Sequence, residues 1–569
     1  MPKIKDRVQR ESWRSKSAWA AVFIVTILLA FQTVRVHAFP DSRVSRQSQR
    51  QYWAQIPIST SRGDVRDRNG IPLAISVPSV SFFIDPMFWQ PASADAFTPF
   101  FGKAVTDKFS RTLPGRFHWV ERKVPFAVAE KLIEKDVPGL FRIRESQRKY
   151  PHGELASQVI GFCDIDGSGL SGVEREWNNV LFSPPQTRFF VRDAKGNLLD
   201  FIGSSAGTLQ VGAGSITLTL DSKIQQIVEW RLREGAVAAG TKWGAGVCVD
   251  PGTGEIIAMA SYPQTDLNDR SSFGNVEALR NNAIARVYEP GSTFKPIFLG
   301  IAKEMGVAPQ NELFSCHGRL AIAGGVIRDV SSHGTLDQEG LLIKSCNTGM
   351  ATIGNRVNAH RAYGMLRQFG FGVKSDIEIS GEEEGLLRSP GEWLGIARAN
   401  LAIGQGLAVT PLQLAMGVSA IANGGELLKP YVIAEVRNAN GKVIHQGRKR
   451  VRNAVLNEST CAWIREALAK TVSVGTGKAA RVEGVDLAGK TGTAQIAMGG
   501  GYTKGRYVSS FVGFWPHDDP DYVLLIVLGE PSGTRYYGGE IAAPIFKAIV
   551  EDMSRMTMTA QSDRIAVDS

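Results

Sequence analysis

The most informative stretch of this 569-residue chain is Glu289-Pro290-Gly291-Ser292-Thr293-Phe294-Lys295-Pro296. Glu-Pro-Gly is a turn sequence, and the apolar residues that follow, up to Met305, predict a helix that begins at Ser292. Pro296 supports this start, because a missing backbone N–H costs little in the first turn of a helix. Residues three apart share one face of a helix, so we expect the Lys295 amine to lie beside the Ser292 hydroxyl.

A serine and a lysine in this arrangement suit nucleophilic catalysis. A serine hydroxyl is a poor nucleophile at neutral pH unless a base takes its proton, and a lysine acts as that base only when its pKa is depressed. Burial and a second nearby cation both depress a lysine pKa, and the helix start offers backbone N–H groups to a developing oxyanion. The alternative is that Ser292 is an N-cap and Lys295 a solvated residue of the first turn.

A second motif, Ser345-Cys346-Asn347, lies between two helix-like runs at residues 336–343 and 350–357. It is therefore predicted on a short connection, where functional residues are common. A hydroxyl and an amide two residues apart can face one cleft, with Ser345 relaying a proton and Asn347 holding a substrate amide. The alternative is a capping pair between two helices. Cys346 is predicted to be a small buried side chain rather than a second nucleophile.

A third motif, Lys490-Thr491-Gly492-Thr493, precedes strand-like runs at residues 507–514 and 522–528. These runs predict an antiparallel sheet with the motif on its edge strand. Lys490 would offer a cation to a substrate carboxylate, and it is the second cation expected to depress the Lys295 pKa. The two threonines would offer hydroxyls, and Gly492 would let a ligand backbone approach closely. The alternative is a glycine bulge in an ordinary strand.

Each motif alone is weak, because a chain of this length contains roughly two Ser-x-x-Lys matches by chance. The ordered set is specific, and it matches the signature that penicillin-binding proteins share with serine β-lactamases. The flanking residues resemble class B penicillin-binding proteins, the monofunctional peptidoglycan D,D-transpeptidases, over nearly the whole chain. The matching segments are residues 62–70, 150–153 and 169–174, with Ser171 where an acidic residue is usual, and residues 403–406, 409–415 and 536–539.

Residues 289–293 are similar to those of the division-specific (septal) subgroup, whereas the elongation type more often has a second proline where Glu289 stands. The resemblance implies an α+β fold with an N-terminal transmembrane helix, a strand-rich pedestal of the dimerisation type and a β-lactamase-like transpeptidase domain. Local patterns agree, since a helix at residues 222–237 and a hairpin at residues 246–261 predict helices packed on an antiparallel sheet. The pedestal is expected to contain loops such as residues 91–97.

The resemblance also implies a two-step mechanism in septal cell-wall synthesis. Ser292 attacks the carbonyl between the terminal D-alanines of a donor stem peptide, with Lys295 as base and Ser345 as proton shuttle. An amine of a neighbouring stem peptide then resolves the acyl-enzyme and forms the cross-link, and β-lactams acylate the same serine. The backbone N–H groups of Ser292 and Thr493 form the oxyanion hole. The substrate-binding residues implied are Asn347, Lys490, Thr491, Gly492 and Thr493.

Other functions share some of these features. An elongation-type transpeptidase would use the same chemistry, and a D,D-carboxypeptidase would use water as the acceptor. A β-lactamase shares the site, but such enzymes are small, lack a pedestal, and in the class with Ser-Thr-Phe-Lys have an apolar residue where Asn347 stands. A non-catalytic division scaffold or β-lactam sensor would bind ligand without turnover, which the intact motif residues argue against.

The N-terminal segment is predicted to anchor the chain in a membrane. Basic residues up to Lys16 precede an apolar run at residues 18–31 that Val34 can extend, and such a basic flank stays in the cytoplasm. The rest of the chain is then expected on the outer side of a membrane that it crosses once, and the resemblance implies that this is a bacterial inner membrane. The alternative is a cleaved signal peptide, because Val36-His37-Ala38 is similar to a cleavage site.

The chain is long enough for several domains. Their predicted bounds are residues 1–17 for a cytoplasmic basic tail, 18–38 for the transmembrane anchor, 39–212 for the pedestal, 213–557 for the transpeptidase domain and 558–569 for a tail. Beyond residue 539 most residues predict one helix, so no further C-terminal module is expected.

The charge distribution and the cysteine spacing argue against nucleic-acid-binding, disulfide-rich and metal-binding proteins. The net charge of +10 is spread along the chain, and a basic-aromatic motif is lacking, so nucleic acid is not expected as a partner. The five cysteines are an odd number at irregular spacing, so they predict no disulfide framework. An oxidising exterior would allow one or two bridges, but several cysteines, such as Cys248, are expected to be buried thiols. No Cys/His cluster in the sequence has metal-ligand spacing, so neither a metal nor a cofactor is predicted. The partners that the resemblance implies are peptidoglycan stem peptides, β-lactams, a SEDS-type glycan polymerase and other division proteins.

Overall fold

The computed structural model describes residues 3–38, 53–58, 61–115, 117–183, 186–192, 198–199, 213–498 and 501–568. The chain divides into two compact units, residues 1–60 with 184–210 and residues 61–183 with 211–569. The second unit draws on both sides of the predicted boundary at residue 212, and residues 39 and 212 lie outside the described ranges. The domain bounds therefore stay a prediction.

The first unit contains one long helix and a small sheet. Helix α1 (Lys3–Ala38) joins the predicted basic tail and the predicted anchor without a break. Its part Trp13–Ala38 is exposed, apolar and long enough to cross a membrane, which is consistent with a single-pass anchor. In the same unit, antiparallel strands pair in the order β1 (Trp53–Ile58), β6 (Gln186–Arg192) and β7 (Leu198–Leu199).

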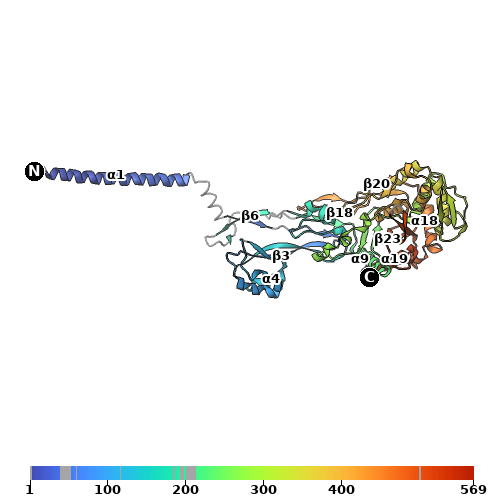
Figure 1. The fold of residues 1–569 in the computed structure, drawn as a ribbon, viewed down its shortest axis with the longest axis horizontal. Coiled ribbons are helices and arrows are strands. Elements are labelled where there is room, and N and C mark those ends of the chain that lie inside the picture. Colours follow the sequence, from blue (N-terminus) through green and yellow to red (C-terminus); the bar gives the residue numbers. More distant parts are fainter. Residues whose placement is uncertain are drawn as a thin grey trace. The chain divides into compact units, whose positions relative to one another are not determined.

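In the second unit, a seven-stranded sheet combines strands from distant parts of the chain (Figure 1). The order is β19-β18-β8-β2-β3-β4, and β5 pairs with β3. The strands are β2 (Val65–Arg66), β3 (Pro72–Ile84), β4 (His118–Pro125), β5 (Leu140–Lys149), β8 (Ser215–Leu218), β18 (Ile433–Arg437) and β19 (Val443–Gln446). Because β2 pairs in parallel with β8, residues before 183 and after 211 share one sheet.

An aromatic core lies beside β3. It is covered by η1 (Pro91–Phe97), α3 (Thr98–Phe101), α4 (Lys103–Phe109) and α5 (Phe126–Ile133). Phe97 is fully buried and stacks on Trp89 with ring centroids 5.2 Å apart. The prediction of a loop at residues 91–97 is wrong, because buried Ala94 and Phe97, three residues apart, fix the segment as a 3-10 helix.

A group of buried charges, named here the Glu174 cluster, joins three of the predicted pedestal motifs. The carboxylate of Glu174, in α7 (Gly172–Glu176), accepts hydrogen bonds from Arg62 Nε at 2.5 Å and Arg148 Nε at 2.6 Å. The Tyr150 hydroxyl donates to the same carboxylate at 3.4 Å. Burial opposes ionisation of Glu174, but the two guanidinium groups outweigh it and lower the pKa of Glu174.

A five-stranded antiparallel sheet forms the centre of the rest of this unit. Its order is β10-β9-β23-β22-β21. The strands are β9 (Trp243–Val249), β10 (Ile256–Tyr262), β21 (Ala488–Met498), β22 (Gly501–Trp515) and β23 (Tyr522–Gly529). The predicted hairpin at residues 246–261 is confirmed, and the third motif lies on edge strand β21, as predicted.

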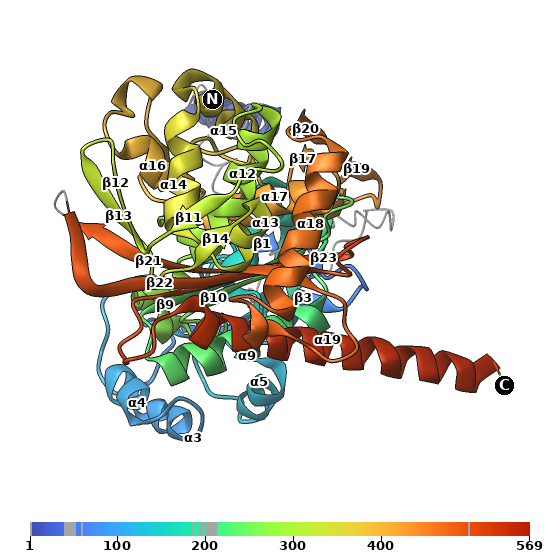
Figure 2. The same cartoon turned by 90° about the vertical axis from the view of Figure 1, so that its right-hand side faces the viewer.

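Helices cover both faces of this sheet (Figure 2). Helices α9 (Ser222–Ala239) and α19 (Gly538–Asp568) pack on one face. The other face carries α12 (Lys295–Glu304), α14 (Asn347–Arg356), α17 (Pro411–Ala422) and α18 (Glu458–Ser473), and α17 is buried along its whole length. The predicted α+β architecture is confirmed. Helix α19 confirms the predicted C-terminal helix and continues through the residues predicted as a tail.

The remaining elements are short. The helices are α6 (Ser157–Ile160), α8 (Asn178–Leu181), η2 (Arg270–Gly274), α10 (Val276–Leu279), α11 (Asn282–Ala285), η3 (Gly291–Phe294), α13 (Gln338–Ile343), α15 (Ala359–Gln368), η4 (Pro390–Glu392), α16 (Ala397–Ala402) and η5 (Lys478–Ala480). The strands pair as β11 (Phe314–Cys316) with β14 (Gly334–Leu336), β12 (Arg319–Ile322) with β13 (Gly325–Arg328), β15 (Leu386–Leu387) with β16 (Leu407–Ala408), and β17 (Glu426–Leu428) with β20 (Val451–Ala454). All five cysteines are unpaired and buried, which confirms the expectation of buried thiols for Cys248 and extends it to the others.

Candidate active site

Ser292 lies in the first turn of the predicted helix. The 3-10 turn η3 runs directly into α12 at Lys295, which confirms the predicted helix start. Gly291 has a φ of 58°, a conformation that glycine adopts without a side-chain clash, and Thr293 Oγ1 donates to Pro290 O at 2.7 Å. This segment, residues 290–294, is named here the Ser292 turn, and it leaves Ser292 half-buried.

The predicted motif at residues 403–406 supports the Ser292 turn from outside. Gly291 N donates to Gly404 O at 3.0 Å. A Cβ on Gly404 would lie 2.0 Å from Gly291 O, so only glycine fits there without moving the turn. Gly406 N donates to Glu289 Oε1 at 2.9 Å. The glycines of this motif therefore hold the backbone that carries Ser292.

Lys295 connects the first motif to the second. Its side chain is fully buried, and Nζ donates to Ser345 O at 2.6 Å, Asn347 Oδ1 at 2.7 Å and Ser345 Oγ at 3.3 Å. Among the described residues, no hydrogen bond joins Lys295 to Ser292, because these three acceptors take the amine instead. Burial lowers the pKa of Lys295 from its ordinary 10.5 to about 8, although Asp329 and Cys346 act in the opposite direction.

Ser345 occupies the predicted short connection, and Asn347 lies directly after it. Residues 344–346 link α13 to α14, and Asn347 is the first residue of α14. Ser345 has a φ of 57°, a left-handed conformation that costs a non-glycine residue about 1–2 kcal/mol. Asn347 Nδ2 donates to Arg328 O at 2.9 Å, so both ends of its amide are held.

Asp329, which no sequence motif marks, holds the second motif in place. Its carboxylate accepts hydrogen bonds from Asn347 N at 2.5 Å and Thr348 N at 3.0 Å. Burial raises the pKa of Asp329, but these backbone N–H groups outweigh it, so the pKa falls below its ordinary value. Burial raises the pKa of the Cys346 thiol to about 12, which agrees with the prediction that Cys346 is not a second nucleophile. Asp329 and Cys346, rather than Ser345 and Asn347, cap helix α14.

Lys490 is a second fully buried lysine. Its Nζ donates to Thr491 O at 3.2 Å, Thr491 Oγ1 at 3.3 Å and Thr476 Oγ1 at 3.5 Å. Burial lowers the pKa of Lys490 well below its ordinary value, and the charge of Lys295 lowers it further. Sequence patterns missed Thr476, and the one signal for it is the turn sequence Gly475-Thr476-Gly477 directly after α18.

Gly492 lets the third motif touch the Ser292 turn. A Cβ at this position would lie 2.5 Å from Ser510 Oγ, 2.8 Å from Thr293 Cγ2 and 3.0 Å from Pro290 O. The backbone that approaches Gly492 in the structure is therefore that of the protein itself. The strand register is continuous from Ala488 to Gln495, so the alternative of a bulge at Gly492 is wrong.

Thr493 lies where strand β21 meets the Ser292 turn. A Cβ on Gly291 would lie 3.1 Å from Thr493 O, and in an antiparallel strand the N–H and C=O of one residue point the same way. The N–H of Thr493 therefore faces the Ser292 turn. Its hydroxyl accepts a hydrogen bond from Gly538 N at 3.0 Å. The predicted motif at residues 536–539 therefore holds the Thr493 side chain in place.

These contacts bring the three motifs to one place. Lys295 binds the second motif, and Pro290 and Thr293 pack on the third. The arrangement offers a half-buried hydroxyl at a helix start, a buried lysine with a pKa near neutrality and a strand N–H group beside them. It has the parts that acyl transfer through a serine requires.

Comparison with known proteins agrees with this geometry. The family model described as the penicillin binding protein transpeptidase domain matches residues 244–551, and the penicillin-binding protein dimerisation domain matches residues 57–208. Stage V sporulation protein D of Bacillus subtilis is 31% identical over 96% of this chain and 86% of its own length. The peptidoglycan D,D-transpeptidase FtsI of Escherichia coli is 30% identical over 97% and 93%.

Solved structures agree as well. Penicillin binding protein 3 of Mycobacterium tuberculosis, complexed with aztreonam, superimposes with a TM-score of 0.68 at 26% identity and covers 88% of this chain and 97% of that one. With both family domains in the expected order and two relatives matched over almost their full lengths, the chain belongs to the class B penicillin-binding proteins, on the division-type branch.

Proposed function

We propose that this chain is a serine D,D-transpeptidase that cross-links peptidoglycan stem peptides during septal cell-wall synthesis. One observation carries the proposal. The amine of Lys295 is fully buried, has a depressed pKa and is bound to Ser345 and Asn347, one turn from Ser292. A buried amine of this kind can accept a proton near neutral pH, which an ordinary lysine cannot.

In the first step, Ser292 Oγ attacks the carbonyl between the two terminal D-alanines of the donor. The hydroxyl proton passes to the neutral amine of Lys295 as the carbon–oxygen bond forms. The backbone N–H groups of Ser292 and Thr493 stabilise the oxyanion, since one lies at a helix start and the other faces the Ser292 turn. Each such donor is worth about 3–4 kcal/mol of barrier in enzymes of this type.

Ser345 would carry the proton onward. Its Oγ lies 3.3 Å from Lys295 Nζ, within reach of a proton relay to the leaving amine. The carbon–nitrogen bond then breaks, D-alanine departs and an ester to Ser292 remains. In the second step, an amine of a neighbouring stem peptide attacks this ester, the carbon–oxygen bond breaks, and the proton returns to Ser292.

The third motif would bind the terminal carboxylate of the donor. Lys490, Thr491, Gly492 and Thr493 line the edge of β21 next to the Ser292 turn. A carboxylate beside Lys490 would favour its protonated form, which burial otherwise disfavours. Asn347 keeps one acceptor lone pair and one N–H beyond its two bonds, enough to hold a peptide amide of the donor. A β-lactam would enter as a mimic of the same donor and acylate Ser292.

Helix α1 supports a proposal for the location of the enzyme. We propose that its basic end stays in the cytoplasm and that the catalytic unit lies on the outer side of the inner membrane. The proposed divisions are a basic tail at residues 1–17, an anchor at 18–38, a pedestal at 39–212, a transpeptidase domain at 213–557 and a tail at 558–569. By family resemblance, the partners would be a SEDS-type glycan polymerase and other division proteins, contacted through the anchor and the pedestal.

The test is a donor–acceptor assay on the full chain in detergent. A peptide ending in D-Ala-D-Ala is supplied with a labelled acceptor amine, and D-alanine release is followed with cross-linked product in wild type and Ser292→Ala. We expect both products in wild type and neither in the variant. D-Alanine without cross-link would show a D,D-carboxypeptidase.

The same preparation distinguishes a transpeptidase from a β-lactamase and from a sensor or scaffold. A fluorescent penicillin should label wild type stably. A label that forms and quickly decays would show a β-lactamase, and a stable label with no peptide turnover would show a sensor or scaffold. Elongation and division types share this chemistry, so depletion in cells separates them. Loss of septation with elongation intact is the expected result.

A further inference from the structure

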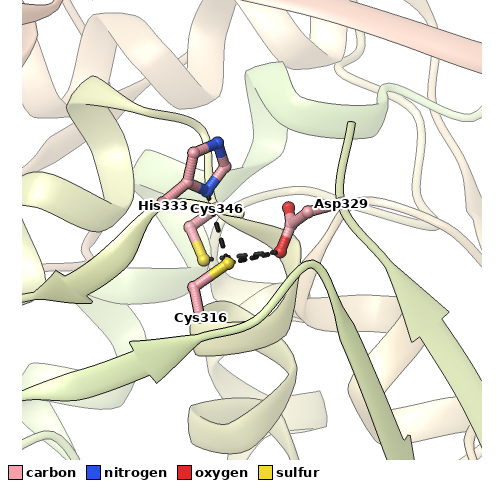
Figure 3. A group of neighbouring side chains, drawn as sticks. All are labelled: Cys316, Asp329, His333 and Cys346. Atoms are coloured by element: carbon pink, nitrogen blue, oxygen red, sulfur yellow. Dashed lines mark hydrogen bonds between the residues drawn. The ribbon is translucent and has the colours of Figure 1, made fainter. Parts of the chain in front are cut away.

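Four side chains with metal-binding atoms meet directly beside the second motif (Figure 3). They are Cys316 of β11, Asp329 and His333 from the segment between β13 and β14, and Cys346 at the start of α14. One ligand atom of each lies within 4.8 Å of the others. The sequence predicts no metal because these residues have irregular spacing, but the fold brings them together.

The distances fit one small metal ion. Cys316 Sγ lies 3.4 Å from Asp329 Oδ2 and 3.5 Å from His333 Nδ1, and Cys346 Sγ lies 3.5 Å from the same carboxylate oxygen. A tetrahedral zinc with about 2.3 Å to sulfur and about 2.0–2.2 Å to nitrogen or oxygen separates its ligand atoms by about 3.3–3.8 Å. The side chains therefore need to move little to share one ion.

We propose that these four residues bind a zinc ion. Two sulfurs, one imidazole nitrogen and one carboxylate oxygen form a complete tetrahedral set of zinc donors, whereas calcium and magnesium prefer sites made of oxygen atoms. Binding releases the two thiol protons to solvent, so both sulfurs ligate as thiolates. His333 ligates through Nδ1 and carries its proton on Nε2.

Contacts around the ligands hold them in position. Gly349 N donates to Cys346 Sγ at 3.4 Å, and Ser332 Oγ donates to the carbonyl of Cys316 at 2.8 Å. The Asp329 carboxylate accepts from two backbone N–H groups at the start of α14. Such outer contacts orient metal ligands in known sites. Both cysteines are fully buried while Asp329 and His333 are half-buried, which leaves a route for the ion from solvent.

The consequence concerns the second motif, and this step rests on the proposed function. Cys346 stands between Ser345 and Asn347, and Asp329 accepts the backbone N–H of Asn347. A zinc ion would tie both residues to β11 and so fix the acceptors of Lys295, including Ser345 in its left-handed conformation. The four ligands are thus positioning residues, and loss of the metal should slow acylation without removing the nucleophile.

The test measures metal content and acylation separately on the reduced full chain in detergent. After dialysis against zinc and removal of the excess, elemental analysis should find one zinc per chain in wild type. Cys316→Ala and His333→Ala should each lose it. The matched control is Cys461→Ala, because Cys461 is equally buried but bonds only the carbonyl of Ala420 within the described residues.

Cobalt substitution keeps the test decisive where a variant folds poorly. Wild type loaded with cobalt should show tetrahedral d–d bands and a sulfur-to-cobalt charge-transfer band, and Cys461→Ala should match it. Chelation of wild type should slow penicillin acylation several-fold, and zinc should restore it.

Three results would overturn the zinc site. They are a folded, penicillin-reactive wild type that takes up no zinc, zinc content unchanged in both ligand variants, and a disulfide between Cys316 and Cys346 in the native chain. Zinc-loaded protein that does not react with penicillin would instead contradict the proposed function and leave the metal site standing, so the two failures are distinguishable.

Discussion

Two regions of this molecule bury charged side chains, with opposite results. In the Glu174 cluster, Arg62 and Arg148 meet one carboxylate, which keeps its charge because the pKa of Glu174 is lowered. At the active site, Lys295 and Lys490 are equally buried but meet mostly neutral oxygen atoms, so burial lowers the pKa values of both amines, and the charge of Lys295 lowers that of Lys490 further. The charge of the neighbouring groups, rather than burial itself, decides whether a buried side chain stays ionised.

The difference separates stability from reactivity. A buried ion pair that loses one member leaves an uncompensated charge and destabilises the fold by about 3–5 kcal/mol. A buried amine without a strong counter-charge costs stability while it is protonated, but it supplies a base near neutral pH. Substitutions in the first region should therefore change folding, and substitutions in the second should change chemistry.

The largest expected effect is that of Lys295→Met. Methionine fills a similar volume and cannot accept a proton, so penicillin acylation should fall by about 10²–10⁴-fold. Wild type below pH 8 carries the cost of a buried ammonium, on the order of 3 kcal/mol from the shift between 10.5 and about 8. The variant lacks this cost, although it loses the bonds to Ser345 and Asn347. Stopped-flow labelling measures the acylation rate, and denaturant unfolding at pH 7 measures the free energy of unfolding.

We expect the unfolding free energy of Lys295→Met to equal or exceed that of wild type at pH 7. The pKa of Lys295 is lower in the folded than in the unfolded chain, so the free-energy cost of its buried charge in wild type falls as pH rises from about 8 to 10.5. Any stability advantage of the variant over wild type falls over the same pH range. Lys303→Met, on the same helix but bonded to Gln338, is the control and should label normally. A strongly unfolded Lys295→Met would contradict the comparison.

Glu174→Ala should lose stability but keep the acylation rate, the reverse of Lys295→Met. Removing the carboxylate leaves two buried guanidinium groups facing each other, and we expect a loss of about 3–5 kcal/mol in unfolding free energy. Labelling by penicillin of the fraction that remains folded should keep its wild-type rate. Glu176→Ala, at an exposed position of the same helix α7, should be within about 0.5 kcal/mol of wild type. Slow labelling of folded Glu174→Ala would show that the two regions are not independent.

The pH dependence of acylation is the next effect in size. Only neutral Lys295 acts as a base, and the neutral form grows as pH rises toward the pKa of about 8. The acylation rate of wild type should therefore rise about tenfold per pH unit below pH 8, about 50-fold from pH 6 to 8, and level off above it. A flat profile over this range would remove Lys295 from the role of base.

Gly404→Ala tests how firmly the Ser292 turn must be held. The new Cβ would lie 2.0 Å from Gly291 O at a φ of 77°, so we expect a loss of about 3 kcal/mol and slower labelling. Gly406→Ala has a similar φ of 80° but open space around its Cβ, and about 1 kcal/mol is expected from strain alone. Equal effects of the two variants would show that the close contact with Gly291 does not matter.

Thr476→Val should have the smallest effect. The Thr476 hydroxyl accepts from Thr491 Oγ1 at 3.2 Å and from Lys490 Nζ at 3.5 Å, and loss of such bonds is worth about 1 kcal/mol, or about fivefold in the second-order rate of acylation. Thr476→Ser keeps the hydroxyl and should react like wild type. If valine and serine variants react equally, the hydroxyl does not orient the third motif.

Much of the site follows from local patterns in the sequence. The turn before Ser292, the connection that carries Ser345 and the edge strand that carries Lys490 are each set by nearby residues: glycine and proline, helix periodicity and alternating apolar residues. The order of the three motifs then indicates acyl transfer through a serine.

Other features depend on contacts between distant residues, which no local pattern records. Asp329 and Thr476 reach the motifs from loops, and Cys316 meets His333 through the pairing of β11 with β14. The same reason explains Gly492. Its neighbours Pro290 and Ser510 come from other segments. The sequence alone therefore predicts that a ligand backbone approaches Gly492, whereas in the structure the Ser292 turn lies there.

The most direct test of the central claim is the position of the covalent bond to penicillin. Wild type is treated with penicillin, digested and examined by mass spectrometry, with Ser292→Ala treated in parallel. We predict a single adduct on the peptide that contains Ser292, and none in the folded variant. An adduct on Ser345 or on any other residue, or an unmodified Ser292 in folded wild type, would contradict the account.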